Sequence, residues 1–424
     1  MNGKESFLQR EGTRSVLASL LSIVIGLAFG ALAILIVGLL SADLGLESAW
    51  EGIRLIFGGL FSTGRGAAGE LSWGFNGQNI GNMLFRATPL IMTGLSVAMA
   101  YKTGLFNIGA PGQYLIGTLT SLAIALGIPA GTLPGWLVWV LAFCGAMLAG
   151  ALWGAIPGAL KAFLNINEVI ACIMTNWIAA NFVTWMFSIS NFKNVAENTK
   201  SSYIYKTTYG LVNGAYVSGE GIATAKLGLD RLFPGSQVNG GILIAVVFAI
   251  VVHVMMSKTT FGYELKACGA NRHAARYAGI ADRRNIVLSM AIAGSLSAGG
   301  AALYWLSGNT EFFWSTYQAL PAIGFNGIPV ALLAVCNPIG VIFTAIFMSM
   351  LTVSGLQLTN LTAYNEYITD VIISVIVYLS AFSLVIKLWL GRRRPVPPKL
   401  GAEPPSTPSQ SAADAKDEKG GDAE

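Results

Sequence analysis

Long apolar runs alternate with short polar segments along this chain. Ten apolar segments stand out in this pattern. They cover residues 15–40, 87–100, 105–126, 134–160, 168–187, 240–256, 286–306, 321–335, 338–354 and 367–390. A helix needs about 20 apolar residues to cross a bilayer, and most of these runs approach or exceed that length. The pattern predicts an all-α fold: a polytopic transmembrane helical bundle of about ten spans.

Composition agrees with a membrane protein. Hydrophobic residues make up 54% of the 424 positions and charged residues 11%, and the mean hydropathy is +0.61. Soluble domains carry about 25% charged residues. The run 15–40 is longer than the apolar core of a signal peptide, so we expect it to be retained as the first span.

Basic residues set the expected orientation. Lys and Arg concentrate in residues 258–284 and 387–394, and cytoplasmic loops carry such an excess. With an even number of spans, the N-terminal residues 1–14 and the polar, disordered tail 391–424 are both cytoplasmic, and residues 15–390 form the membrane domain. Eight spans remain an alternative if the short second and eighth segments are re-entrant.

Two long segments fall on the outer side in this orientation. Residues 41–84 include an amphipathic piece at 49–61, expected to lie along the membrane interface. Residues 188–239 are polar, and a loop of that length is usually functional or disordered.

The segment 105–126 is interrupted near its start. Asn107, Gly109, Pro111 and Gln113 lie together there. Irregular backbone at membrane depth is tolerated only inside protein or beside a water-filled cavity, and transporters place solute paths at such interrupted helices. The alternative is a glycine-rich loop at the membrane surface.

Small residues recur every four positions in the fourth segment, at Ala146, Gly150, Gly154 and Gly158. This spacing lets helices approach closely, so we expect a packing role.

Glu168 begins the fifth segment, where a carboxylate favourably meets a helix N-terminus.

The cytoplasmic loop 258–285 is too charged to enter lipid. Its alanines favour helix, and Gly269 and Asn271 supply a break or cap, so a short helix–turn–helix is expected. Two interpretations stay open: a basic loop held by anionic lipid head groups, or a docking helix for a cytoplasmic partner.

Four motifs carry a family resemblance. They are GLFNIGAPGQ (104–113), NEVIACIMTNWIA (167–179), GYELKACGANRHAARYAGI (262–280) and GFNGIPVALLAVCNPIG (324–340). Together they resemble the permease subunit of ATP-binding-cassette (ABC) importers, in the branch for simple sugars and nucleosides, and nucleoside-type permeases more closely. The resemblance extends over residues 86–390.

The resemblance implies a type II importer-like bundle in a bacterial cytoplasmic membrane. Its partners would be a second permease, expected to be a different related chain, an ABC ATPase subunit and an extracytoplasmic substrate-binding lipoprotein, besides membrane lipid. Loop 258–285 would be the coupling segment, with Arg272 contacting the ATPase. The residues that match the coupling pattern or flank it are Gly269, Arg272, Ala274, Ala275, Arg276, Gly279 and Ile280. Relatives often have an acidic residue where this chain has Pro111, so no role of that carboxylate carries over.

The chain itself lacks the means to hydrolyse ATP. It contains no GxxxxGK[ST] phosphate loop, so ATP would be used by the partner subunit, and this chain is expected to need no cofactor and to be no enzyme. The four cysteines have no metal-ligand spacing, and the positive charge flanks apolar spans, which does not indicate nucleic acid.

Uncharged polar residues at the breaks are the candidates for the substrate pathway. A second break is expected at Phe325 and Asn326, which repeat the Phe–Asn pair of the first. Asn and Gln bond hydroxyls or base edges without carrying charge into lipid, and aromatic rings stack on a base. The expected pathway residues are Phe106, Asn107, Gln113, Asn176, Phe325 and Asn326.

Three other functions compete with nucleoside import. A ribose-like sugar is the nearest alternative substrate. An ion-coupled secondary transporter generally needs ionisable groups buried at mid-membrane, and the central spans have almost none. An intramembrane enzyme would need a metal or nucleophile setting, and the two histidines, His253 and His273, provide none.

Overall fold

The computed structural model describes residues 11–40, 45–196, 202–314, 319–365 and 367–381. Nearly all regular structure in these residues is helical. The helices are α1 (Glu11–Leu40), α2 (Leu46–Gly58), η2 (Gly59–Phe61, a 3-10 turn), α3 (Gly77–Lys102), α4 (Ala110–Gly127), α5 (Gly135–Leu164), α6 (Glu168–Ile189), α7 (Leu229–Leu232), α8 (Gly241–Lys258), α9 (Thr260–Ala270), α10 (Arg272–Tyr277), α11 (Asp282–Trp305), α12 (Ala322–Leu333), α13 (Pro338–Leu361) and α14 (Tyr367–Ala381).

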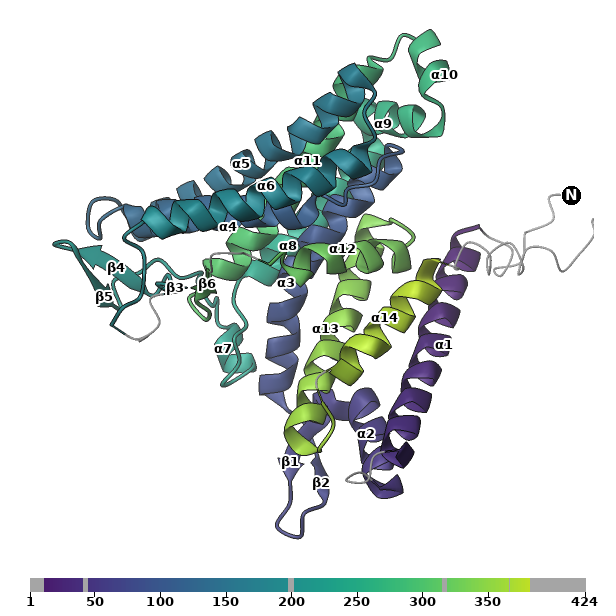
Figure 1. Cartoon of the computed structure of the whole chain (residues 1–424), viewed down its shortest axis with the longest axis vertical. Helices are drawn as coiled ribbons and strands as arrows, with labels where there is room; N and C mark the ends of the chain where they lie inside the picture. Colours follow the sequence, from purple (N-terminus) through teal and green to yellow (C-terminus); the bar gives the residue numbers. More distant parts are fainter. Residues whose placement is uncertain (1–10, 41–44, 197–201, 315–318, 366, 382–424) are drawn as a thin grey trace, which may run out of the picture.

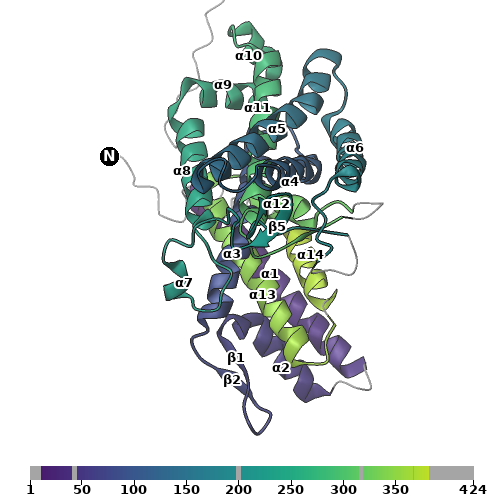
Figure 2. The same ribbon diagram turned by 90° about the vertical axis from the view of Figure 1, so that its left-hand side faces the viewer.

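The helices form two arms (Figures 1 and 2). One arm contains α4, α5, α6 and α11, and the other contains α1, α2, α13 and α14. Helix α3 joins them because it packs against α11 in the first arm and against α13 in the second. Helices α9 and α10 project at one end of the molecule (Figure 1).

Each predicted apolar segment falls largely on a helix in the described residues, and residues 382–390 of the tenth lie outside them. Seven helices, namely α1, α3, α5, α6, α8, α11 and α13, are long and apolar enough in the described residues to cross a membrane. Helices α4, α12 and α14 account for the other three segments. The fold is therefore that of a multi-pass, all-α membrane protein, as predicted.

The second predicted segment was too short. Helix α3 begins at Gly77 instead of 87, capped by the Asn76 side chain, which accepts a hydrogen bond from the Asn79 backbone N–H at 3.0 Å. Arg86, which the prediction used as a boundary, lies inside the helix. Arginine interrupts an apolar run in the sequence, but it does not end a helix because its helix propensity is high.

The first interruption lies before α4 instead of within it. Residues 103–109 are irregular, and Pro111 stands in the first turn of α4. Proline is favoured there because the first helical N–H groups have no partner inside the helix. Asn107 within this segment is fully buried in the protein.

The second predicted break was wrong. Helix α12 runs without interruption through Phe325 and Asn326. The irregular backbone comes later, at Val335 and Cys336, which both have φ of +52°. The Phe–Asn pairs of the two motifs therefore lie in different backbone settings, and the internal similarity does not extend to structure.

Helices α5 and α11 confirm the predicted packing role of the glycine row. A Cβ atom at Gly150 would lie 2.5 Å from the carbonyl oxygen of Gly294, and one at Gly154 would lie 3.1 Å from the Gly294 Cα. A Cβ at Gly158 would meet Met290 at 2.9 Å. The two helix backbones can touch because glycine has no Cβ atom at these positions.

The polar segments between helices carry short strands. The strands are β1 (Ser62–Arg65), β2 (Leu71–Trp73), β3 (Tyr203–Ile204), β4 (Tyr209–Val212), β5 (Ala215–Ser218) and β6 (Phe312–Phe313). They pair as three antiparallel two-stranded sheets, β1–β2, β3–β6 and β4–β5. The β4–β5 hairpin covers the end of α4, where the Tyr216 hydroxyl donates to the Leu126 carbonyl at 3.2 Å. Much of the 188–239 segment thus has regular structure. The predicted amphipathic piece at 49–61 lies mostly on helix α2.

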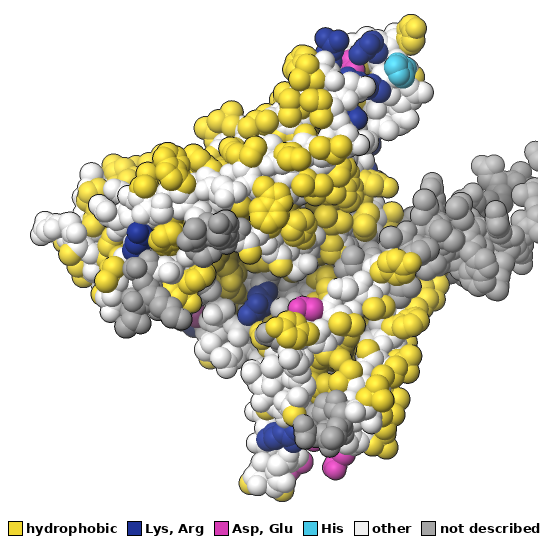
Figure 3. Space-filling model, in the orientation of Figure 1, with side chains coloured by type: hydrophobic (Ala, Val, Ile, Leu, Met, Phe, Trp, Pro, Cys, Tyr) yellow, Lys and Arg dark blue, Asp and Glu magenta, His cyan; other side chains and the backbone are white. Residues whose placement is uncertain are grey.

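The surface divides by residue type (Figure 3). Hydrophobic side chains cover the flanks of the helices, and Lys and Arg gather at the end formed by α9 and α10. Helix α6, for example, exposes Met174 by 60% and Ile178 by 58%. Residues 1–10 and the predicted tail 391–424 lie outside the described residues.

A buried amide cluster and the α9–α10 loop as the candidate functional site

Asn107 and Gln113 bond to each other inside the helix bundle. The Asn107 Nδ2 donates to Gln113 Oε1 at 2.9 Å, and Gln113 Nε2 donates to Asn107 Oδ1 at 3.2 Å. Asn107 also donates to the Ser96 hydroxyl of α3 at 2.9 Å and accepts from the Gly109 N–H at 3.1 Å. Both residues are at most 1% exposed, so in this conformation their side-chain amides bond within the protein and not to solvent.

Asn176 of α6 holds the same irregular segment from the other side. Its Oδ1 accepts from the Gly112 N–H and its Nδ2 donates to the Ile108 carbonyl, each at 2.9 Å. The amide thus satisfies one free donor of the α4 start and one carbonyl of the loop. We call Asn107, Gln113 and Asn176 the amide cluster.

The start of α4 also meets α12. A Cβ atom at Gly324 would lie 2.7 Å from the backbone nitrogen of Pro111, so glycine is required for this approach. Two motifs far apart in the sequence therefore touch. Phe325, next to this contact, is 37% exposed, and Asn326 is partly buried.

The structure therefore separates the six predicted pathway residues into two groups. Asn107, Gln113 and Asn176 are buried and hydrogen-bonded, and Phe106 is partly buried. Phe325 and Asn326 lie on α12, which packs against the start of α4 where Gly324 meets Pro111.

The predicted helix–turn–helix is confirmed. Helix α9 ends at Ala270 and α10 begins at Arg272, and Asn271 between them caps α10 by accepting from the Ala274 N–H at 3.0 Å. Gly279, with φ of +78°, then turns the chain towards α11. Gly269 is helical, so Asn271 alone supplies the break.

Arg272 and Arg276 both bind Asp282, the first residue of α11. Arg272 Nε lies 2.6 Å from Asp282 Oδ2, and Arg276 Nη2 lies 3.0 Å from the same oxygen. The carboxylate raises the pKa of Arg276 through this hydrogen bond. The pair fixes α10 to α11, and the guanidinium of Arg272 is engaged within the chain. The sequence analysis identified the two arginines but not their partner Asp282.

The remaining predicted coupling residues lie around the turn between the two helices. Ala275 is buried, and the Ile280 N–H donates to its carbonyl at 3.0 Å, whereas Ala274 is exposed. A groove of about 550 Å³ separates α9 from α10, and Ala274, Ala275 and Ile280 line it. Tyr277 at the end of α10 is 95% exposed.

Helix α9 touches the segment that leads to the amide cluster. A Cβ atom at Gly269 would lie 2.8 Å from the carbonyl carbon of Thr103 and 2.9 Å from the nitrogen of Gly104. Gly104 has φ of +75°, and its own Cβ would lie 3.0 Å from the Gly269 Cα. Backbone meets backbone here, at the first residues of the irregular segment 103–109.

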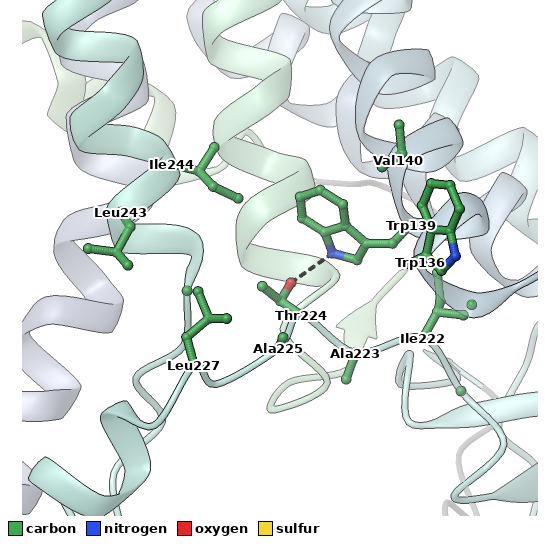
Figure 4. Close-up of a pocket in the computed structure, with 13 residues that line it drawn as sticks. Trp136, Trp139, Val140, Ile222, Ala223, Thr224, Ala225, Leu227, Leu243 and Ile244 are labelled. Carbon is green, nitrogen blue, oxygen red and sulfur yellow. Dashed lines mark hydrogen bonds between the residues drawn. The ribbon is translucent and has the colours of Figure 1, made fainter.

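A cavity of about 470 Å³ lies at the opposite end of α5 and α8 (Figure 4). Trp136 and Trp139 of α5 form one wall and Leu243 of α8 the other. Thr224 supplies the one polar side chain of the lining, and its hydroxyl already accepts from Trp139 Nε1 at 2.9 Å. The lining offers few groups that could bind a polar solute.

Comparisons with known proteins identify the family. Residues 79–381 match the family model described as branched-chain amino acid transport system / permease component. The chain belongs to this permease family. The permease is 31% identical to the guanosine ABC transporter permease protein NupP of Bacillus subtilis, over 89% of this chain and 96% of the relative. It is 33% identical to the nucleoside ABC transporter permease protein NupB of Lactococcus lactis, over 91% and 95%.

Further similarities widen the range of relatives. A glucose ABC transporter permease of Haloferax volcanii is 32% identical over 64% of this permease and 68% of the relative. Bacillus subtilis and Lactococcus lactis each have a second similar protein, a guanosine and a nucleoside permease, both 24% identical. The relatives named here are transporter permeases, and this permease is likewise a membrane transport subunit.

Proposed function

We propose that this chain is the membrane-spanning permease subunit of an ATP-driven importer that translocates nucleosides across a bacterial cytoplasmic membrane. The observation that carries the proposal is the pair of relatives that span about nine-tenths of the chain, both named for guanosine or nucleosides. The glucose permease relative covers less of the chain, 64%, which supports nucleosides over a simple sugar.

ATP hydrolysis takes place on a separate ABC ATPase subunit in this proposal, because the chain has no phosphate loop. The ATPase docks at α9 and α10, which project from the helices and carry the gathered Lys and Arg residues (Figure 3). This end faces the cytoplasm by the positive-inside rule, and both termini lie on that side.

Coupling passes through backbone contacts. Helix α9 moves with the ATPase and displaces residues 103–109 through the Gly269–Gly104 contact. That displacement reaches the amide cluster and, through Pro111 and Gly324, helix α12. The amides then exchange their mutual bonds for bonds to the nucleoside hydroxyls, and Phe325 stacks on the base.

Two further partners complete the importer. A second, related permease forms the other half of the pore, which is supported by the second similar permeases in Bacillus subtilis and Lactococcus lactis. A substrate-binding lipoprotein delivers the nucleoside at the end opposite α9 and α10.

Uptake into proteoliposomes tests this proposal. The chain is reconstituted with its ATPase, second permease and binding protein, with ATP available to the ATPase subunit. We expect saturable uptake of labelled guanosine that requires ATP and that unlabelled nucleosides, but not ribose, compete away. Uptake without ATP would indicate a secondary transporter, and equal competition by ribose would indicate a sugar permease.

A further inference from the structure

A second cavity lies at the α9–α10 end of the molecule, where the C-terminal ends of α3 and α8 meet α9 and the turn between α12 and α13. Its volume is about 330 Å³. Lys102 ends α3 and Lys266 lies on α9, and both line this space together with His253 of α8. We call it the lysine cavity.

Positive charge dominates the lining of the lysine cavity. Its lining contains no Asp or Glu. Among the ion pairs of the described residues, neither Lys102 nor Lys266 has a carboxylate partner. The acidic residue nearest in the α9 sequence, Glu264, accepts from Asn285 at 2.9 Å and lies 3.8 Å from Arg284, so it is engaged on the α11 side.

The inner wall of the lysine cavity is apolar. Met99, Val252, Met256 and Cys336 line it and are buried. An anion bound here therefore meets cationic side chains with apolar surface close by. A small hydrated anion would gain little from that apolar surface, whereas an amphiphilic anion would bury apolar area against it.

Helix α8 leads from the lysine cavity along the exposed side of the bundle. Val247, Ile250, Val251 and Val254 are each between 46% and 56% exposed. On a membrane-spanning helix such side chains face lipid. The cavity thus lies at one end of an exposed apolar helix face, which acyl chains would cover in a membrane.

We propose that the lysine cavity binds an anionic phospholipid of the cytoplasmic leaflet, with its phosphate between Lys102 and Lys266 and its acyl chains along α8. The side on which the cavity lies rests on the orientation in the proposed function. Lys102 directly precedes Thr103, and Lys266 lies three residues before Gly269. The lipid therefore links α3 to α9 beside the Gly269–Gly104 contact and holds the two in register.

Lipid retention by the purified full chain tests this site. Native mass spectrometry compares binding of phosphatidylglycerol with binding of phosphatidylcholine. The wild-type chain is expected to prefer phosphatidylglycerol, and the double variant Lys102→Gln/Lys266→Gln to lose roughly 30-fold in its affinity, equivalent to ~1 kcal/mol for each lysine. Lys102→Arg/Lys266→Arg keeps the charge and is expected to retain the lipid.

The matched control removes two positive charges at the opposite end. Lys226 and Arg231 are both exposed there, and Lys226→Gln/Arg231→Gln is expected to bind phosphatidylglycerol as the wild type does. Equal retention by the lysine-cavity variant and the wild type, or equal loss in the control, would overturn the proposal. Displacement by inorganic phosphate would instead assign the cavity to a soluble anion. Neither nucleoside nor ATPase is present, so failure here leaves the proposed transport function untouched.

Discussion

Three buried amides carry the polar chemistry of the irregular segment 103–109. Asn107, Gln113 and Asn176 each have donors and acceptors that would be costly to bury without partners, and every one of these side chains is bonded. The cluster provides hydrogen-bond partners for backbone groups that have none within a helix. It also means that any role in binding substrate requires these bonds to be exchanged.

Replacing Asn176 with alanine tests the bridge between α6 and α4. The change leaves the Gly112 N–H and the Ile108 carbonyl unpaired, so we expect a loss of about 1–3 kcal/mol in the free energy of unfolding. Asn181, an exposed amide on the same helix, provides the control, since its side chain bonds only the Trp177 carbonyl of its own helix. Thermal unfolding in detergent measures both; equal melting temperatures of Asn176→Ala and Asn181→Ala would contradict the bridge.

Because Asn107 and Gln113 bond to each other, we expect the effects of substituting them on the free energy of unfolding to be strongly non-additive. Asn107→Leu and Gln113→Leu each strand the partner amide, whereas the double variant removes both amides. We expect the double variant to be more stable than the sum of the single effects implies, with a coupling of about 0.5–3 kcal/mol. Nucleoside uptake is expected to fall in all three while the ATPase still binds. A double-mutant cycle of unfolding free energies makes the test, and simple additivity would refute the pairing.

Ion pairs and close backbone contacts hold the α9–α10 unit to the bundle. Asp282 binds α10 through Arg272 and Arg276, and Gly269 fixes α9 against residues 103–104. Glu168 lies in the first turn of α6, at the helix N-terminus where it was predicted, and it also forms an ion pair with Lys161 at 2.9 Å. Ion pairs and glycine contacts thus determine how the loop sits on the helices.

Removing the Asp282 carboxylate is expected to release α10. In Asp282→Ala both guanidiniums lose their hydrogen-bonded partner, so the free energy of local opening of α10 should fall by about 1–3 kcal/mol. Hydrogen exchange of residues 272–278 measures this opening. Asp230→Ala, which removes an exposed acid from α7, should leave that exchange unchanged. Unaltered protection in Asp282→Ala would show that the arginines do not hold α10.

Some elements could be predicted from the sequence and others could not. The helix–turn–helix was predictable because alanine-rich stretches flank the capping residue Asn271. A close helix contact of α5 was predictable because its glycines repeat every four residues, although its partner α11 was not. The start of α3 was missed because Arg86 interrupts an apolar run without interrupting a helix. The break assigned to Phe325 failed because glycine and proline weaken a helix only where packing does not compensate, and Gly324 packs closely on Pro111. The partners of Asn107 and Arg272 depend on tertiary contacts that no local pattern contains.

At the scale of the whole molecule, one continuous contact path joins the projecting loop to α4 and α12. It runs from α9 through Gly269 and Gly104 to the amide cluster, and from Pro111 through Gly324 to α12. Each step is a close backbone contact or a hydrogen bond, and close-packed interiors transmit displacement with little compression. Our central claim is that this path couples ATP hydrolysis to nucleoside movement.

The number of nucleosides moved per ATP hydrolysed by the reconstituted importer tests this claim most directly, in Gly269→Ala beside the control Gly45→Ala. A Cβ atom at Gly269 would meet backbone that cannot rotate away, whereas one at Gly45 has open space around it. We predict that Gly269→Ala continues to hydrolyse ATP but moves several-fold fewer nucleosides per ATP, while Gly45→Ala matches the wild type. An unchanged ratio in a stable, assembled Gly269→Ala importer would contradict the account.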